Sequence, residues 1–77
     1  MEKRGINNFD ELEFAVFCVE NIAIKLCVSG EVIYRKLTED SNILYDYIVA
    51  SYDVLHTQGK DYIVEDIVDT MREKGVL

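Results

Sequence analysis

The chain has 77 residues, with fifteen Asp and Glu against eight Lys and Arg, and its net charge is −7. A chain of this length forms one domain, and its excess of carboxylates disfavours a nucleic-acid partner because phosphate binding depends on Lys and Arg. The longest apolar stretch, residues 14–28, is interrupted by polar side chains and is shorter than the ~20 apolar residues of a membrane-spanning helix. The first residues lack the apolar core of a signal peptide, so we expect a cytoplasmic protein.

The chain is predicted to be all-α, because it has no proline, four glycines and no low-complexity segment. Turn signals divide it into a compact bundle of four helices with short turns, over residues 9–28, 30–39, 42–55 and 61–74. Side chains that can cap the helix starts are Asn7 or Asn8, Ser29, and Asp40 or Ser41. We expect residues 1–77 to form a single helical domain, with residues 1–8 as a loose N-terminal segment.

The first predicted helix has apolar residues on two faces. One face contains Leu12, Val16, Val19, Ile22, Ala23 and Leu26. Across from it, mixed among acidic residues, lie Phe14, Phe17, Ile24 and Val28. Two explanations are open: the other helices pack around this helix on all sides, or another chain covers part of the second face.

The two cysteines, Cys18 and Cys27, lie nine positions apart in the same predicted helix. This separates their Cα atoms by about 13 Å along the helix axis, beyond the reach of a disulfide. Neither another Cys nor a second His is present to complete a zinc site. We expect both cysteines to be buried and reduced, and no metal or cofactor to be bound.

The third predicted helix carries a stripe made of Tyr45, Val49, Tyr52 and His56, which recur at helical spacing. Tyrosine is enriched at protein interfaces, because it combines a large apolar ring with a hydroxyl that forms hydrogen bonds. The stripe is therefore interpreted either as part of the core or as a recognition surface.

The segment YDVLHTQG, residues 52–59, contains the only histidine and links the third and fourth predicted helices. His56 follows Asp53 by three residues, a spacing at which the two side chains can pair. Gly59 suits a left-handed turn, and Thr57 or Gln58 can satisfy free backbone groups. A recognition surface and a catalytic site are the competing interpretations to a structural junction, which is predicted to consist of Asp53, His56, Thr57 and Gly59.

In the catalytic interpretation, His56 acts as a general base, with Thr57 or a cysteine as the nucleophile. Adjacent side chains on a helix point apart, and the cysteines belong to an apolar segment without evident oxyanion donors. We therefore predict that the protein is not an enzyme, and we assign no catalytic residue.

The fourth predicted helix has acidic residues at four-residue intervals, namely Asp61, Glu65 and Asp69. Like charges at this spacing destabilise a helix by about 0.2–0.5 kcal/mol per pair. The row is either a solvated face or an acidic patch for a basic partner, in which carboxylates imitate the phosphates of a nucleic acid. Gly75 is expected to end this helix in a left-handed conformation.

Three runs together resemble one family: YDVLHTQG over residues 52–59, YIVEDI over residues 62–67 and EFAVFCVENIA over residues 13–23. They are similar to the short bacterial proteins of the domain of unknown function 3791 (DUF3791) family, and the resemblance covers nearly the whole chain. The family is uncharacterised. Its members resemble small, standalone proteins of bacteria and their mobile elements. Some are encoded beside proteins similar to ADP-ribosyltransferase toxins, and the resemblance therefore implies an antitoxin or immunity role.

We therefore predict a protein–protein interaction module that binds a partner, with a basic surface as its natural complement, or a second copy of itself. It would be an antitoxin, immunity or regulatory partner of a neighbouring gene product. The alternatives are an acidic nucleic-acid-mimicking inhibitor from a mobile element and a helix-turn-helix module formed by the third and fourth helices. No membrane and no small-molecule substrate is expected. The candidate interface residues are Phe14, Phe17, Ile24, Tyr45, Tyr52, His56, Asp61, Glu65 and Asp69.

Overall fold

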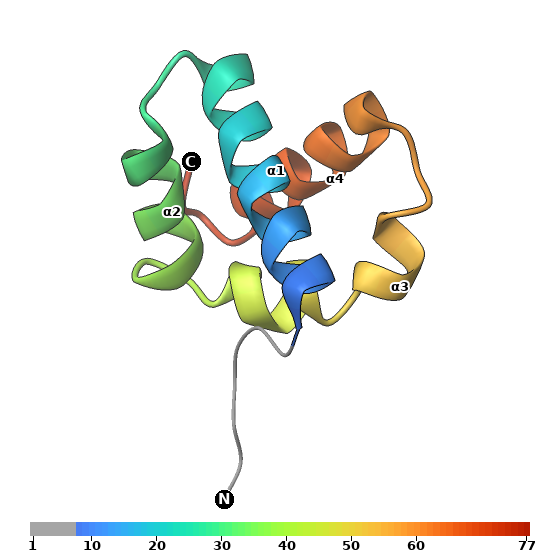
Figure 1. Cartoon of the computed structure of the whole chain (residues 1–77). Helices are drawn as coiled ribbons and strands as arrows, with labels where there is room; N and C mark the ends of the chain where they lie inside the picture. Colours follow the sequence, from blue (N-terminus) through green and yellow to red (C-terminus); the bar gives the residue numbers. More distant parts are fainter. Residues whose placement is uncertain (1–7) are drawn as a thin grey trace, which may run out of the picture.

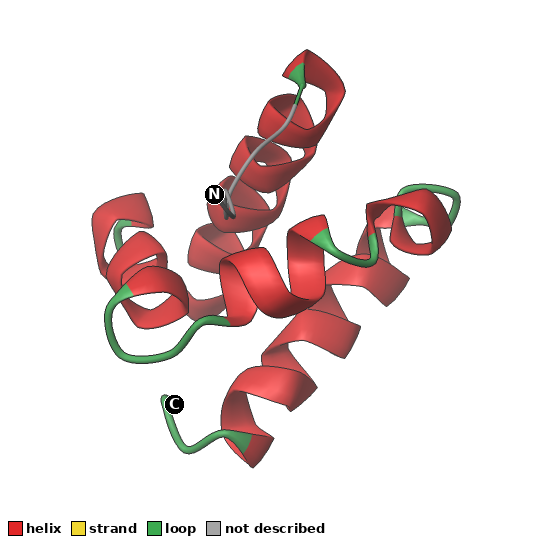
Figure 2. Cartoon of the chain, turned by 90° about the horizontal axis from the view of Figure 1, so that it is seen from below, coloured by secondary structure: helices red, strands yellow, loops and turns green. Residues whose placement is uncertain are grey.

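A computed structural model describes residues 8–77 as helices joined by short loops (Figure 1, Figure 2). The elements are α1 (Phe9–Leu26), α2 (Gly30–Thr38), the π-helix η1 (Leu44–Val49), α3 (Tyr52–Leu55) and α4 (Lys60–Glu73). No strand occurs in the described part of the chain, which confirms the all-α prediction. Most of the predicted N-terminal segment, including the candidate cap Asn7, lies outside the described residues.

Side-chain caps fix the points where α1 and α2 begin. Asn8 Oδ1 accepts a hydrogen bond from the backbone N–H of Glu11 at 2.9 Å. Ser29 Oγ accepts one from the N–H of Val32 at 3.3 Å. Each cap satisfies a backbone donor that has no partner within its own helix, and both confirm the predicted helix starts.

α1 ends at Leu26, earlier than predicted, because Cys27 takes a left-handed conformation with φ 59°. The N–H of Val28 bonds to the carbonyl of Ala23 at 3.0 Å, and that of Cys27 to Ile24 at 3.3 Å. These two bonds are those of a Schellman cap. Cys27 is consequently exposed, so the prediction that both cysteines are buried is wrong for this residue.

The buried side of α1 carries small and medium-sized residues. Its buried residues are Phe14, Ala15, Cys18, Ile22 and Ala23. α1 contacts α2, η1 and α4, and Figure 1 shows α2 on one side of it, α3 on the other and α4 behind it. Small side chains at the centre of a helix face allow neighbouring helices to approach closely, and this face therefore forms the middle of the core.

The predicted core face of α1 is only partly correct. Ile22 and Ala23 are buried as expected, but Leu12 and Val16 are 43% and 46% exposed. Phe14, expected on the opposite face, is buried. The predicted core face is formed by the larger apolar side chains, whereas the observed buried face is centred on the smaller ones. α1 is therefore rotated about its axis relative to the predicted orientation.

The third predicted helix, residues 42–55, is not continuous. The π-helix η1 includes an extra residue in each turn, and the chain leaves helical geometry at Ser51, with φ −101° and ψ 13°. The hydroxyl of Tyr47 donates a hydrogen bond to the carboxylate of Asp66 on α4, which ties the irregular segment to the core. Residues after the break are rotated relative to those of η1.

α4 has the buried face that its sequence predicts, formed by Ile63, Val64, Ile67, Val68 and Met71. Gly75 ends the chain's last turn with φ 78°, as predicted. The N–H groups of Val76 and Gly75 bond to the carbonyls of Met71 and Arg72 at 3.0 and 3.1 Å. Lys36 Nζ of α2 donates to the carbonyl of Val76 at 3.0 Å, which joins this end to α2.

The substitution Gly75→Ala is expected to lower the free energy of unfolding by about 1 kcal/mol, because a Cβ disfavours a positive φ. Gly30→Ala is the matched control, since Gly30 lies in the first turn of α2 without a positive φ and a Cβ there meets only Val19 Cγ1 at 3.8 Å. Urea denaturation of both variants measures the difference. Equal stability of the two variants would contradict the left-handed assignment at Gly75.

Candidate functional site

Four aromatic rings form a continuous row from α1 to α3. Phe17 stacks on Phe14 with ring centroids 6.3 Å apart, and Phe14 meets Tyr52 edge to face at 5.4 Å. Tyr52 stacks on the imidazole of His56 at 4.3 Å, with the two rings 9° from parallel. The row begins half-buried at Phe17, passes through the core at Phe14 and ends in solvent at His56. We call these four residues the ring row.

The backbone carbonyl of Tyr52 fixes the tautomer of His56. His56 Nδ1 lies 2.6 Å from this carbonyl oxygen, and because a carbonyl only accepts, Nδ1 carries the hydrogen. The predicted pairing with Asp53 is not observed, since the imidazole turns to Tyr52 instead. Thr57 Oγ1 donates to the carbonyl of Val54 at 2.7 Å, which confirms that Thr57 satisfies a free backbone group at the end of α3.

Gly59 does not adopt the predicted left-handed conformation. It has φ −72° and ψ 161° and stands directly before α4 as its N-cap, without a side-chain hydrogen bond. Glycine is accepted at this position because an N-cap has extended backbone geometry. The segment from Tyr52 to Gly59 links α3 to α4 and contains the stacked Tyr52–His56 pair, and its structural role stays a prediction.

Neither Thr57 nor Cys18, two of the candidate nucleophiles, is hydrogen-bonded to His56. His56 and Thr57 each bond to a separate backbone carbonyl and not to one another. Cys18 is fully buried, and burial raises the pKa of its thiol to about 12. Within the described residues, no three His, Cys, Asp or Glu side chains converge as metal ligands. No helix of the described part is both long and apolar enough to cross a bilayer.

The ring row forms the floor of an open groove of about 730 Å³ between α1 and α3. We call it the α1–α3 groove. Its lining residues are Phe9, Asp10, Leu12, Glu13, Phe14, Val16, Phe17, Glu20, Tyr52, His56, Gln58 and Ile63. The side chains from α1 supply one wall, and α3 with the first turn of α4 supplies the other.

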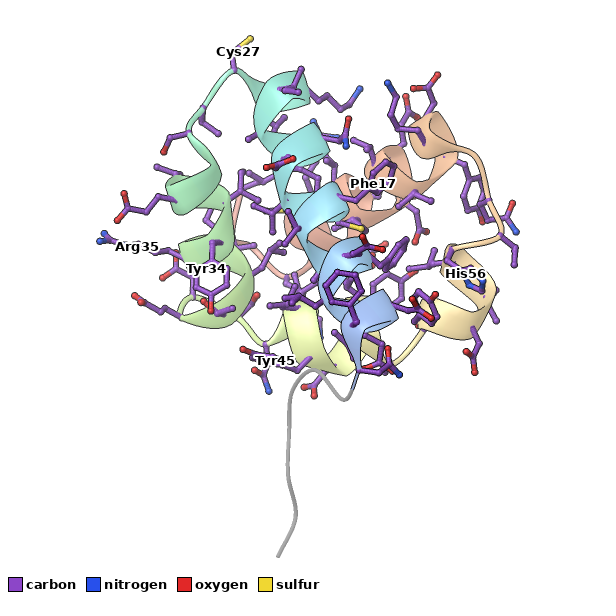
Figure 3. All side chains as sticks on the ribbon, viewed as in Figure 1. Phe17, Cys27, Tyr34, Arg35, Tyr45 and His56 are labelled. Carbon is purple, nitrogen blue, oxygen red and sulfur yellow. The ribbon has the colours of Figure 1, made fainter. Side chains whose placement is uncertain are left out.

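A second apolar hollow of about 330 Å³ lies on the other side of the same α1 residues, toward α2 and η1. We call it the α1–α2 groove, and it is lined by Leu12, Ala15, Val16, Val19, Glu20, Gly30, Tyr34, Leu44 and Tyr45. Figure 3 places Tyr34 and Tyr45 on this side of α1, and Phe17 and His56 on the other. Burial, and then a hydrogen bond with Tyr34, raise the pKa of Tyr45.

The exposed residues of α1 join the two grooves. Leu12, Val16 and Glu20 line both of them, and Phe9, at the start of the helix, is 67% exposed. Leu12 and Val16 thus form an apolar ridge between two hollows, and Phe9 extends it toward the helix start. An apolar surface that is continuous over several elements marks an interaction site more strongly than scattered apolar residues do.

The predicted interface residues separate into three groups. Phe14, Phe17, Tyr52 and His56 come together in the ring row, while Tyr45 lies in the α1–α2 groove, so the break in the third helix divides the predicted stripe. A third hollow of about 170 Å³ includes Ile24, Asp61 and Glu65. Asp69 lies outside all three hollows and pairs with Arg72 at 3.6 Å.

Sequence reasoning missed Phe9, Leu12, Val16 and Tyr34 as surface residues. The sequence pattern predicts Leu12 and Val16 in the core and gives no signal for Phe9 or Tyr34. The available signal was the row of small residues Ala15 and Cys18. Such residues mark the side of a helix that neighbouring helices approach most closely.

Comparison with known proteins gives a family but no characterised relative. A family model described as "Protein of unknown function (DUF3791)" matches residues 13–74, which agrees with the resemblance found in the sequence. No curated protein and no solved structure matches the chain.

The two thiols are expected to differ in reactivity at about pH 8. Iodoacetamide should modify the exposed Cys27 readily and the buried Cys18 at least about a hundredfold more slowly. Cys18 reacts only after local opening, and its raised pKa keeps the thiol protonated. Mass spectrometry of timed samples measures both rates, with denatured protein as the control. Similar rates in the folded state would contradict the burial of Cys18.

Proposed function

We propose that this chain, which belongs to the DUF3791 family of proteins of unknown function, is a protein-binding module that docks its partner on the exposed side of α1. The observation that carries the proposal is the apolar ridge formed by Leu12 and Val16 between two apolar grooves. A single domain gains nothing from leaving these large side chains in water, whereas a partner that covers them gains about 25 cal/mol for each Å² of buried apolar surface.

The aromatic side chains beside this ridge support a binding role. Tyrosine and other aromatic residues supply much of the free energy of protein association, because they bury a large area with few rotatable bonds. Tyr52 and Tyr34 lie on opposite sides of the ridge, and each retains solvent exposure. A partner that spans the ridge therefore contacts aromatic residues on both sides.

We propose that the protein acts in the cytoplasm as an antitoxin, immunity or regulatory partner of a neighbouring gene product. The net charge of −7 favours a partner with a basic surface. We propose a structural role for Thr57 and not that of a nucleophile, because its hydroxyl bonds to the carbonyl of Val54 and not to His56.

The acidic row of α4 supports nucleic-acid mimicry less well. Glu65 pairs with Lys25 at 3.7 Å and Asp69 with Arg72 at 3.6 Å, so cations interrupt the row. A helix-turn-helix role is also less favoured, because α3 has a single turn and α4 exposes carboxylates where base recognition needs donors such as Arg or Asn.

The substitution Val16→Asp is expected to reduce capture of a native partner by at least about tenfold, because it places a charge in an apolar contact. Val54→Asp is the matched control, since Val54 is 67% exposed and lies outside both α1 grooves. Tagged full-length variants are expressed in the native host, and the co-purified protein is quantified.

Val16→Asp adds a carboxylate three residues from Glu13 and four from Glu20, so we expect it to lower the free energy of unfolding by about 1 kcal/mol, against less than about 0.5 kcal/mol for Val54→Asp. Thermal unfolding should show that both variants are folded at the temperature of the capture experiment. A partner that is recovered equally with wild type and Val16→Asp would rule out the exposed side of α1 as its docking site.

A further inference from the structure

The α1–α3 groove has the length of a helix-binding groove. It follows α1 from Phe9 to Glu20, a span of about 16 Å at 1.5 Å per residue, and its opposite wall runs from α3 to Ile63. About three turns of a helix fit along this span. Elongated apolar grooves of this type accept the apolar face of an amphipathic helix.

The floor of the groove suits apolar side chains that descend from such a helix. The ring row crosses it, with Phe14 buried and with Phe17 and Tyr52 half-buried on either side. Half-buried rings provide contact surface without being flexible, which suits anchor residues at i, i+3 or i+4 and i+7 of an incoming helix.

The rim of the groove is acidic. Asp10, Glu13 and Glu20 are exposed along it, and none of them forms an ion pair within residues 8–77. No Lys or Arg is among the described residues that line either α1 groove. The charge also affects the floor, since burial and then neighbouring carboxylates, Asp10 first among them, raise the pKa of the Tyr52 hydroxyl.

A second copy of the chain fits this rim poorly. A symmetric pair brings the same surface of both molecules together, so the rim carboxylates of one copy would approach those of the other. Like charges placed together across an interface disfavour association, and each copy already carries a net charge of −7. The occupant that complements the groove is apolar on one face and positively charged beside it.

We infer that the α1–α3 groove binds a basic amphipathic helix of a partner protein, an inference that rests on the proposed function. The bound helix places its apolar residues on the ring row and its Lys or Arg residues beside Asp10, Glu13 and Glu20. The groove thus selects its partner by apolar periodicity and by charge.

Two synthetic peptides of about 18 residues test this inference, because that length allows helix formation. Both carry leucine on one helical face; the opposite face is lysine-rich in one peptide and glutamate-rich in the other. Fluorescence anisotropy with the full-length chain, at about 150 mM salt, measures each dissociation constant. The lysine peptide is expected to bind at least about tenfold more tightly.

Two charge-reversed variants of the full chain show where the lysine peptide binds. One is Asp10→Lys combined with Glu13→Lys, two exposed rim positions that line the α1–α3 groove and not the α1–α2 groove. The matched control is Glu39→Lys combined with Glu73→Lys, on exposed positions at the C-terminal ends of α2 and α4 that line neither groove. We expect at least about a tenfold loss of affinity for the rim variant and less than about threefold for the control, since charges beyond roughly 8 Å are largely screened.

Three results would overturn the inference: equal losses for both variants, equal binding of the two peptides, or self-association of the free chain that blocks the lysine peptide. Any of these results leaves the proposed function intact if capture of a native partner still depends on Val16. Only the inference that the groove binds a basic helix is then rejected. Capture that is insensitive to Val16→Asp is the separate result that removes the proposed function.

Discussion

The packing of α1 against its neighbours is the constraint on which the rest of the structure depends. α2, η1 and α4 all contact α1, and its buried face is centred on Ala15 and Cys18, where helices can approach closely. Short helices packed against that face do not cover the opposite side. Leu12 and Val16 therefore remain in solvent, although their size and spacing are those of core residues.

The irregular segment between α2 and α4 converts this open side into a pair of grooves. The π-helix η1, held to α4 through Tyr47 and Asp66, places Tyr45 on the α2 side of α1. The break that follows it directs Tyr52 to the other side, where its ring packs on Phe14. A continuous helix would have kept both tyrosines on one face, with no second wall beside α1.

Much of the fold follows from local sequence signals. The caps at Asn8 and Ser29, the buried face of α4 and the left-handed Gly75 all depend on residues within a few positions of each other, and the sequence predicts them correctly. The π-helix contains Tyr47, which bonds to Asp66 nineteen residues further along the chain, and no local pattern predicts this contact. The positive φ of Cys27 is also unexpected, but for a local reason: a residue with a Cβ rarely adopts a positive φ.

The candidate site is only partly predictable. The sequence identifies the four residues of the ring row as interface candidates, but its pattern predicts the exposed Leu12 and Val16 in the core.

The central claim is that the exposed side of α1 is open in the free chain. A soluble paramagnetic agent, with relaxation of methyl protons measured by NMR in dilute protein, tests this directly. Leu12 and Val16, at 43% and 46% exposed, should relax less strongly than Val54 at 67% but far more strongly than the buried Ile22. Protection of Leu12 and Val16 equal to that of Ile22 would contradict the account.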